Sequence, residues 1–151
     1  MTFDPIVMFC KVVTTITVCR GLCNLGRLGN VRTNQSSTYK YTVNDIELTA
    51  DRAVNGKFQK HIEGDCAVTR HYGYYVFINK EEINIKGLTS ETPVYHEKDE
   101  QHPSVQNIIM FPGGIKGKQM FIYQNKSRPN SGNGEKKNNV LDICEVEIWG
   151  I

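Results

Sequence analysis

The sequence predicts an all-β protein built as a sandwich, jelly roll or barrel. No window of about a dozen residues keeps the apolar period of about 3.6 residues that an amphipathic helix requires. The apolar stretches are instead short and rich in β-branched and aromatic residues, which favour strands. Gly, Asn, Ser and Thr interrupt these stretches often, as expected for turns between many short strands.

Length and composition fit one globular domain. The chain has 151 residues, of which 39% are hydrophobic and 23% are charged, so it is large enough to form a core of its own. A net charge of +2 gives no reason to expect a nucleic-acid partner. Because no run of about twenty apolar residues occurs, we expect no transmembrane segment.

The N-terminal stretch has competing interpretations. Residues 6–18 are mostly apolar and rich in threonine, which is typical of the hydrophobic part of a signal peptide. Asp4 and Lys11 do not fit that pattern. The alternatives are an extra N-terminal strand and an artefact of where the chain was taken to begin. On the first interpretation, residues 1–23 form a leader and residues 24–151 form the domain.

Strands are expected at six places along the rest of the chain. In order, these are 38–43 (TYKYTV), 74–78 (YYVFI), 83–85 (INI), 105–111 (VQNIIMF), 119–123 (QMFIY) and 141–149 (LDICEVEIW). Each is short and rich in residues with high β propensity. Between them, residues 111–114 (FPGG) predict a turn, and the polar stretches 89–104 and 125–139 predict exposed loops.

The last of these stretches is expected to bind the C-terminus to a distant part of the chain. Val146 and Ile148 alternate with Glu145 and Glu147, which is the two-residue period of a half-buried strand. A cysteine in such a strand can tie it to an upstream segment, and a carboxylate beside the cysteine can hold a cation. We expect the upstream partner to be the stretches 53–56 and 64–66.

Cysteine usage favours an extracellular protein. The five cysteines are Cys10, Cys19, Cys23, Cys66 and Cys144. Their spacing lacks the two close pairs of a zinc site, which leaves either unrelated buried thiols or at least one disulfide. We favour a disulfide, and therefore an oxidising compartment and a secreted protein.

Several segments together resemble one known family. They are 35–39 (QSSTY), 50–56 (ADRAVNG), 64–69 (GDCAVT), 117–125 (GKQMFIYQN) and 144–150 (CEVEIWG). In this order they resemble the F-type lectin (fucolectin) family, within the discoidin or coagulation factor 5/8 C-terminal domain group. The resemblance spans residues 24–151. It implies an all-β, discoidin-like β-sandwich jelly roll that binds glycans without enzymatic activity.

The resemblance also implies a disulfide and a structural calcium ion. The family's cysteine pair maps onto Cys66 and Cys144. The calcium ligands map onto the Arg52 and Cys144 carbonyls and the side chains of Asn55, Asp65 and Glu145, oxygen donors of the kind that Ca²⁺ prefers. Lys57 departs from the family pattern, because its ammonium group cannot bind a cation. The alternative is that Glu145 faces solvent on the strand and that Asn55 begins a simple turn.

The family's sugar site does not carry over residue by residue. Val68 stands at the position of its histidine, and about thirty residues of the family pattern are missing after Thr69. Either the domain is a divergent, shortened member of the family or the sequence lacks a segment here. A different group of residues could bind sugars, because aromatic rings stack on sugar faces while Arg and His donate hydrogen bonds. The candidates are Arg70, His71, Tyr72 and Tyr74. The alternative is that these are ordinary strand and turn residues.

The remaining polar clusters point to no enzyme. The chain has no phosphate-binding glycine loop, nucleophile elbow or zinc-protease motif. His96 and Glu97 lie near Asp99 and Glu100 in a polar stretch, and we interpret them as a solvated face. A basic group could meet anionic lipids or sulfated glycans, or could simply keep a loop soluble. It comprises Lys116, Lys118, Lys126, Arg128, Lys136 and Lys137.

Sequons occur at Asn34 and Asn125, and each is a candidate glycosylation site in a secreted protein. Taken together, the sequence predicts a secreted, calcium-supported, glycan-binding module. The first alternative is an adhesion module of the same fold that binds protein, anionic lipid or sulfated glycan without a sugar site. The second is a degenerate domain with a structural role only.

Overall fold

The structure is a computed structural model of the whole chain. It describes residues 6–12, 22–28, 31–36, 39–41, 46–55, 73–98, 106–124, 141, 143 and 145–151. Within these residues the regular structure is mostly strand, with short 3₁₀ helices and no α-helix, so the predicted all-β class is confirmed. No helix in this part of the chain has the length and apolarity to cross a membrane.

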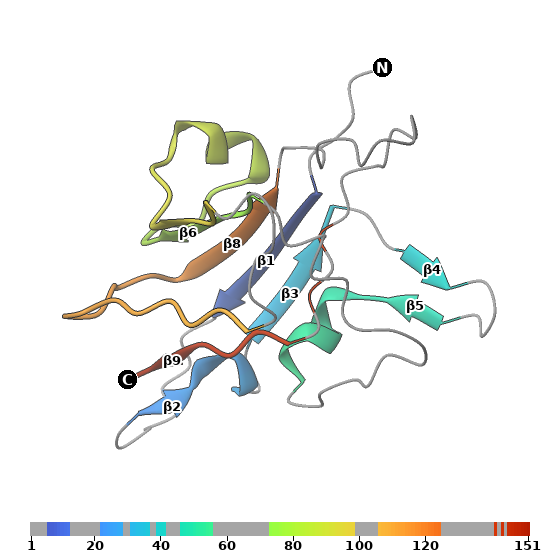
Figure 1. Cartoon of the computed structure of the whole chain (residues 1–151), viewed down its shortest axis with the longest axis horizontal. Helices are drawn as coiled ribbons and strands as arrows, with labels where there is room; N and C mark the ends of the chain where they lie inside the picture. The colour runs from blue at the N-terminus through green and yellow to red at the C-terminus, as the bar shows by residue number, and fades with distance from the viewer. Residues whose placement is uncertain are drawn as a thin grey trace.

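A five-stranded antiparallel sheet dominates the fold (Figure 1). Its strand order is β3–β1–β8–β6–β7. The strands are β1 (Ile6–Val12), β3 (Val31–Gln35), β6 (Tyr75–Asn79), β7 (Tyr95–His96) and β8 (Gln119–Gln124). Beside this sheet stands a hairpin of β4 (Tyr39–Tyr41) and β5 (Ile46–Leu48). The strands predicted at 38–43, 74–78 and 119–123 are therefore confirmed.

The N-terminal stretch supplies an inner strand of the sheet. β1 pairs with β8 along one edge and with β3 along the other, and both pairings are antiparallel. Of the interpretations offered for residues 6–18, an additional strand is the one that the structure shows for Ile6–Val12.

The main core lies on one face of the sheet, at β6 and β8. Phe77 of β6 stands opposite Phe121 of β8, and both side chains are buried. Leu88 covers them from the 3₁₀ helix η4 (Ile85–Ser90), which lies over the β6 end of the sheet in Figure 1. The alternation of the two strands places these side chains on the same face, so their burial fixes the strand register.

A strand predicted at 83–85 is a helix start instead. The Asn84 side chain accepts a hydrogen bond from the Gly87 amide at 3.1 Å and caps η4. Asn is among the residues that cap helices best, because its oxygen satisfies an amide that the helix leaves unpaired. Ile85, which β propensity placed in a strand, is thus the first residue of the helix.

The strand predicted at 105–111 is also wrong where the structure describes it. Residues 106–118 form no strand or helix, and we call this segment the arm. The predicted turn at its tip is confirmed, because the Gly114 amide donates to the Phe111 carbonyl at 2.8 Å. Gly113 and Gly114 have φ of +87° and +72°, a conformation that glycine adopts without steric cost. In Figure 1 the arm extends beyond the sheet before entering β8.

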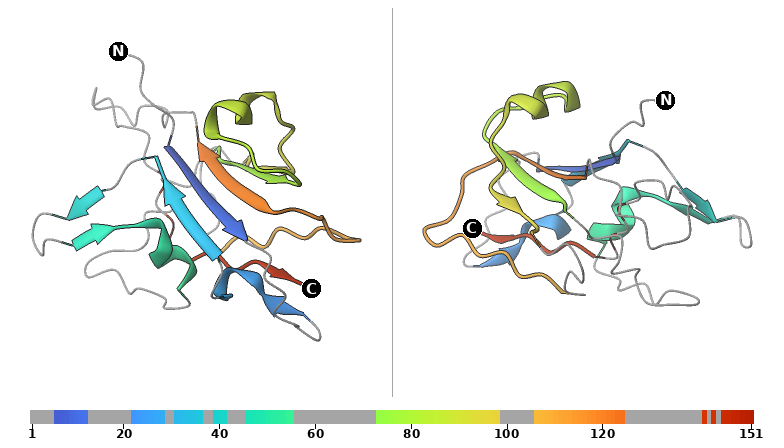
Figure 2. Two further views of the ribbon diagram at one scale, coloured as in Figure 1. Left: turned by 180° about the vertical axis from the view of Figure 1, so that it is seen from behind. Right: turned by 45° about the horizontal axis from the view of Figure 1, so that its top comes forward.

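The C-terminus runs alongside a second group of short elements. β9 (Trp149–Gly150) pairs with β2 (Cys23–Asn24), and the Leu25 amide donates to the Ile148 carbonyl at 2.6 Å. Among the described residues of the predicted 141–149 strand, only Trp149 is in regular strand structure, so that prediction was too long. In Figure 2 (right) β2, β9 and the 3₁₀ helix η2 (Ala50–Val54) lie beneath the five-stranded sheet.

Candidate functional site

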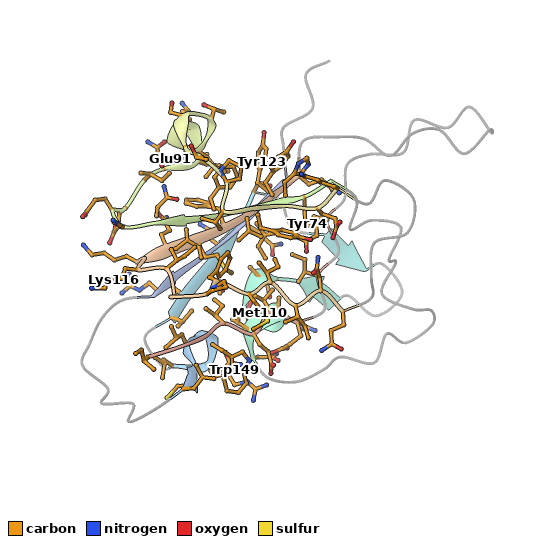
Figure 3. The ribbon with its side chains drawn as sticks, turned by 60° about the vertical axis from the view of Figure 1, so that its left-hand side comes forward. Tyr74, Glu91, Met110, Lys116, Tyr123 and Trp149 are labelled. Atoms are coloured by element: carbon orange, nitrogen blue, oxygen red, sulfur yellow. The ribbon has the colours of Figure 1, made fainter. Side chains whose placement is uncertain are left out.

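Four polar and aromatic side chains meet where β6 begins and β7 ends, at one edge of the sheet. We call them the Tyr74 cluster: Tyr74, Tyr95, Glu97 and Asn107. Tyr74 immediately precedes β6, whereas Tyr95 lies in β7 and Glu97 follows it. Tyr95 and Glu97 are two residues apart and therefore point to the same side of the strand. Asn107 comes from the arm; Figure 3 labels Tyr74 and another arm residue, Met110.

The sheet positions three members of this cluster. The Glu97 amide donates to the Tyr74 carbonyl at 2.9 Å, which holds the two backbones side by side. The Tyr74 and Tyr95 rings lie 5.8 Å apart between centroids and are tilted by 42°. The Tyr95 hydroxyl donates to Glu97 Oε2 at 2.9 Å. The fourth member, Asn107, reaches the cluster from outside the sheet.

The Asn107 amide nitrogen closes the cluster. Its Nδ2 donates toward Tyr74 Oη at 2.8 Å, Tyr95 Oη at 2.7 Å and Glu97 Oε2 at 2.7 Å. Asn107 is exposed, the tyrosines are half-buried, and Glu97 is 9% exposed. In this cluster, two half-buried tyrosine rings and a buried carboxylate thus surround an exposed amide.

Both tyrosines are held in their protonated form. Burial, followed by the neighbouring Tyr95, raises the pKa of Tyr74 far above its ordinary value of 10.0. Burial also raises the pKa of Tyr95, and the hydrogen bond to Glu97 raises it further while Asn107 opposes the shift. Removing a phenol proton would leave an anion against a carboxylate in a poorly solvated place.

We predict that these two tyrosines titrate above the ordinary tyrosine pKa when the protein is made alkaline. A phenol pKa that is raised on folding means that the stabilisation is complete below about pH 10, the unfolded value, and is lost as pH rises above it. Ultraviolet titration at increasing pH should show the late steps, and Tyr74→Phe and Tyr95→Phe should each remove one. Ile108→Ala, an exposed neighbour of Asn107, should remove neither. Unchanged titration curves for both tyrosine variants would contradict the assignment.

Only part of the predicted sugar-binding set can be placed. Tyr74 belongs to the cluster, whereas Arg70, His71 and Tyr72 lie outside the described residues. The sequence interpretation missed Tyr95 and Asn107, and it assigned His96 and Glu97 to a solvated face. That assignment is wrong, because Glu97 is buried and hydrogen-bonded, and the His96 ring stacks on Tyr75 with centroids 4.0 Å apart. The sequence signal for this part of the site was the two-residue spacing of Tyr95 and Glu97, which places both side chains on the same side of a strand.

The expected pairing of the C-terminus with the 53–56 stretch is confirmed. The Val146 amide donates to the Ala53 carbonyl, and Ile143 and Val146 pack against the buried residues of η2. Asn24 adds a second attachment, since its Oδ1 accepts from the Ile148 amide at 3.2 Å and from the Gly26 amide at 3.1 Å. The final segment is thus held between η2 and β2.

This arrangement brings some of the expected calcium ligands together. Arg52 lies within η2, Asn55 follows η2, and Glu145 precedes Val146, whose amide donates to Ala53. The Glu145 side chain is only 15% exposed. Asp65 and the Cys144 carbonyl, the other proposed ligands, lie outside the described residues. Among the described residues, the hydrogen bond between Val146 and Ala53 therefore places the Glu145 segment beside η2, and calcium binding stays a prediction.

Arg27 already lies beside this carboxylate. Its Nη2 is 4.0 Å from Glu145 Oε1 and 2.9 Å from Glu147 Oε1. The closer pair is half exposed and contributes little to stability. The positive guanidinium makes the electrostatic potential at Glu145 less negative. Arg27 would therefore compete with a calcium ion for this carboxylate. No group of three or more His, Cys, Asp or Glu side chains within the described ranges is arranged to hold a metal ion.

The structure describes only some of the residues named in the disulfide and glycosylation predictions. Cys23, in β2, is disulfide-bonded. Cys66 and Cys144 lie outside the described residues, so their pairing stays a prediction. Asn34 lies in β3 with an exposed side chain, whose Oδ1 accepts from the Gln35 amide at 2.8 Å. Asn125 is outside the described part of the chain.

The arm exposes apolar side chains next to positive charge. Ile108, Met110 and Ile115 are 74%, 79% and 42% exposed. Lys116 is exposed (Figure 3), whereas Lys118 forms an ion pair with Glu81 at 3.3 Å. Comparison with known proteins adds no assignment: no family model, no curated protein and no solved structure matches this chain.

Proposed function

We propose that this chain is a secreted, non-enzymatic, glycan-binding module, with the Tyr74 cluster as its binding site. The observation that carries the proposal is the meeting of two half-buried tyrosine rings with a carboxylate and an exposed amide. Rings of this kind cover the apolar face of a sugar, and the Glu97 carboxylate can accept hydrogen bonds from its hydroxyls. The disulfide at Cys23 supports the secreted location.

We further propose that the fold is a discoidin-like jelly roll related to F-type lectins. The antiparallel sheet, the second group of strands beneath it and the attachment of the C-terminus to η2 support this assignment. Arg70, His71 and Tyr72, which lie outside the described residues, come shortly before Tyr74 in the sequence and are the other proposed members of the site.

A glycan array tests the function. We expect the protein to bind a restricted group of glycans, with stronger binding in calcium than in chelator. Binding that is independent of calcium would leave the site standing and remove the cation. No binding to any glycan would contradict the proposal and favour a module with a structural role only.

Calcium is expected to stabilise the fold through Glu145. At a calcium concentration about one hundred times the dissociation constant, binding adds about 2.7 kcal/mol, which corresponds to a rise in melting temperature of roughly 5–10 °C. Glu145→Gln should lose this rise, because it removes the carboxylate of the proposed calcium site. Glu147→Gln, a change on the same segment at a more exposed side chain, is the matched control and should keep the rise. Calorimetric titration that gives no heat would exclude the site.

The arm supports a second candidate function, binding to anionic lipid surfaces. Exposed apolar side chains beside lysine are the features of segments that enter a membrane interface. Co-sedimentation with phosphatidylserine vesicles tests this candidate. Binding that falls steeply with salt and is lost in an Ile108→Ala, Met110→Ala double variant would support it. Equal recovery with neutral vesicles would count against it.

A further inference from the structure

We propose that Tyr74, Tyr95 and Glu97 form a binding site for a primary ammonium group, and that the Asn107 amide occupies this site when no ligand is bound. Three oxygen atoms surround the single nitrogen Asn107 Nδ2 at hydrogen-bond distance. Their distances to it are 2.8, 2.7 and 2.7 Å, so none of the three is a marginal contact.

The number of acceptors exceeds what an amide can use. A side-chain amide nitrogen carries two hydrogens, whereas a primary ammonium group carries three and no acceptor. An ammonium nitrogen in this position would therefore donate one hydrogen bond to each oxygen. It would also place a positive charge against the Glu97 carboxylate, and hydrogen bonds between charged groups are the stronger kind.

The nitrogen, rather than the oxygen, of the Asn107 amide faces the cluster. With the amide reversed, its carbonyl oxygen would stand against the Glu97 carboxylate at the same short distance, and two acceptors would repel each other. The hydrogen-bond network therefore selects the nitrogen. The Tyr95 hydroxyl donates a hydrogen bond to Glu97, so its oxygen accepts the hydrogen bond from Asn107 Nδ2.

The sheet positions the three acceptor residues, whereas Asn107 lies outside the sheet. Tyr74 and Glu97 are joined through their backbones, and Tyr95 lies in β7. Asn107 is an exposed residue of the arm, outside any strand or helix, and its neighbour Ile108 is 74% exposed. A ligand can therefore displace the amide without disturbing the sheet, and the site is already organised to receive it.

The cluster's two rings complete the description of the ligand. Aromatic faces attract cations, so the tyrosines favour the alkyl groups next to an ammonium as well as its charge. The class of ligand is thus a primary alkylammonium. Its identity as an amino sugar rests on the glycan-binding function proposed above. N-acetylation of such a sugar removes both the charge and two of the three donors.

The test is a set of titrations followed by amide chemical shifts, with glucosamine, N-acetylglucosamine and Nα-acetyl-lysine methylamide as probes. We expect glucosamine to bind about tenfold or more tightly than N-acetylglucosamine, since charged hydrogen bonds are lost on acetylation. Glu97→Gln should weaken glucosamine binding by a similar factor. Asn107→Ala should strengthen it several-fold, because the internal competitor is gone, and Ile108→Ala should leave it unchanged.

Each outcome bears on the proposal. Equal affinity for the two sugars, or an Asn107→Ala variant with no gain, would overturn the ammonium site while leaving glycan binding intact. Binding of the lysine derivative as tight as that of glucosamine would support the ammonium site and count against the glycan function. Failure of every probe to bind would overturn the site. Asn107 is exposed, so its variant should fold even if Glu97→Gln does not.

Discussion

Replacing Phe121 with alanine should cost about 3–5 kcal/mol of the free energy of unfolding. Phe121 has no exposed surface, and it stands in an inner strand against Phe77 and Leu88. Its removal leaves a cavity that paired strands on both sides of β8 cannot close. Because the free energy of unfolding of a single domain is about 5–15 kcal/mol, the variant should lose a large part of its stability at room temperature.

Urea denaturation followed by circular dichroism measures this effect. Phe121→Leu keeps most of the volume and should lose clearly less stability. Met110→Ala is the surface control, since Met110 is 79% exposed, and it should change stability by no more than about 0.5 kcal/mol. A Phe121→Ala variant as stable as this control would mean that β6 and β8 do not enclose the core.

The second large effect is expected at Cys23. Removing a native disulfide from a small secreted domain typically costs about 2–5 kcal/mol, and Cys23 lies in the strand that pairs with the C-terminus. Cys23→Ser should therefore unfold at a lower urea concentration than the oxidised wild type. Reduced wild-type protein is the matched control and should be no more stable than the variant.

Peptide mapping before and after reduction completes this experiment. A mass shift that involves the Cys23 peptide is expected, and the same map tests the Cys66–Cys144 pairing. A Cys23 thiol that reacts freely with an alkylating agent in the native protein would contradict the disulfide in β2. A Cys23→Ser variant as stable as the oxidised wild type would contradict its role in holding the C-terminus.

The pattern of apolar residues in the sequence predicted those strands that bury alternate side chains in the core. The strands at 74–78 and 119–123 were predictable because Phe77 and Phe121 lie on one buried face. The same β propensity failed at 105–111, where Ile108 and Met110 face solvent. Propensity describes a residue's fit to a pleated surface, and no strand among the described residues pairs with this segment.

The candidate site was predictable only at Tyr74. Its other members are distant in sequence, and two of them join it for reasons that no local pattern contains. Glu97 is buried because β7 pairs with β6, and Asn107 arrives because the arm passes that edge of the sheet. By contrast, the contact between 53–56 and the C-terminus was predictable, because apolar residues on both segments need burial.

Glycan binding by wild type, Glu97→Gln and Ile108→Ala, measured side by side on one array, tests the central claim most directly. Glu97→Gln keeps the size of a buried side chain that contacts Tyr95 and Asn107, whereas Ile108→Ala alters the exposed residue next to the cluster. The account predicts that wild type and Ile108→Ala bind the same glycans and that Glu97→Gln loses them. Glycan binding that Glu97→Gln leaves unchanged, or none by the wild type, would contradict it.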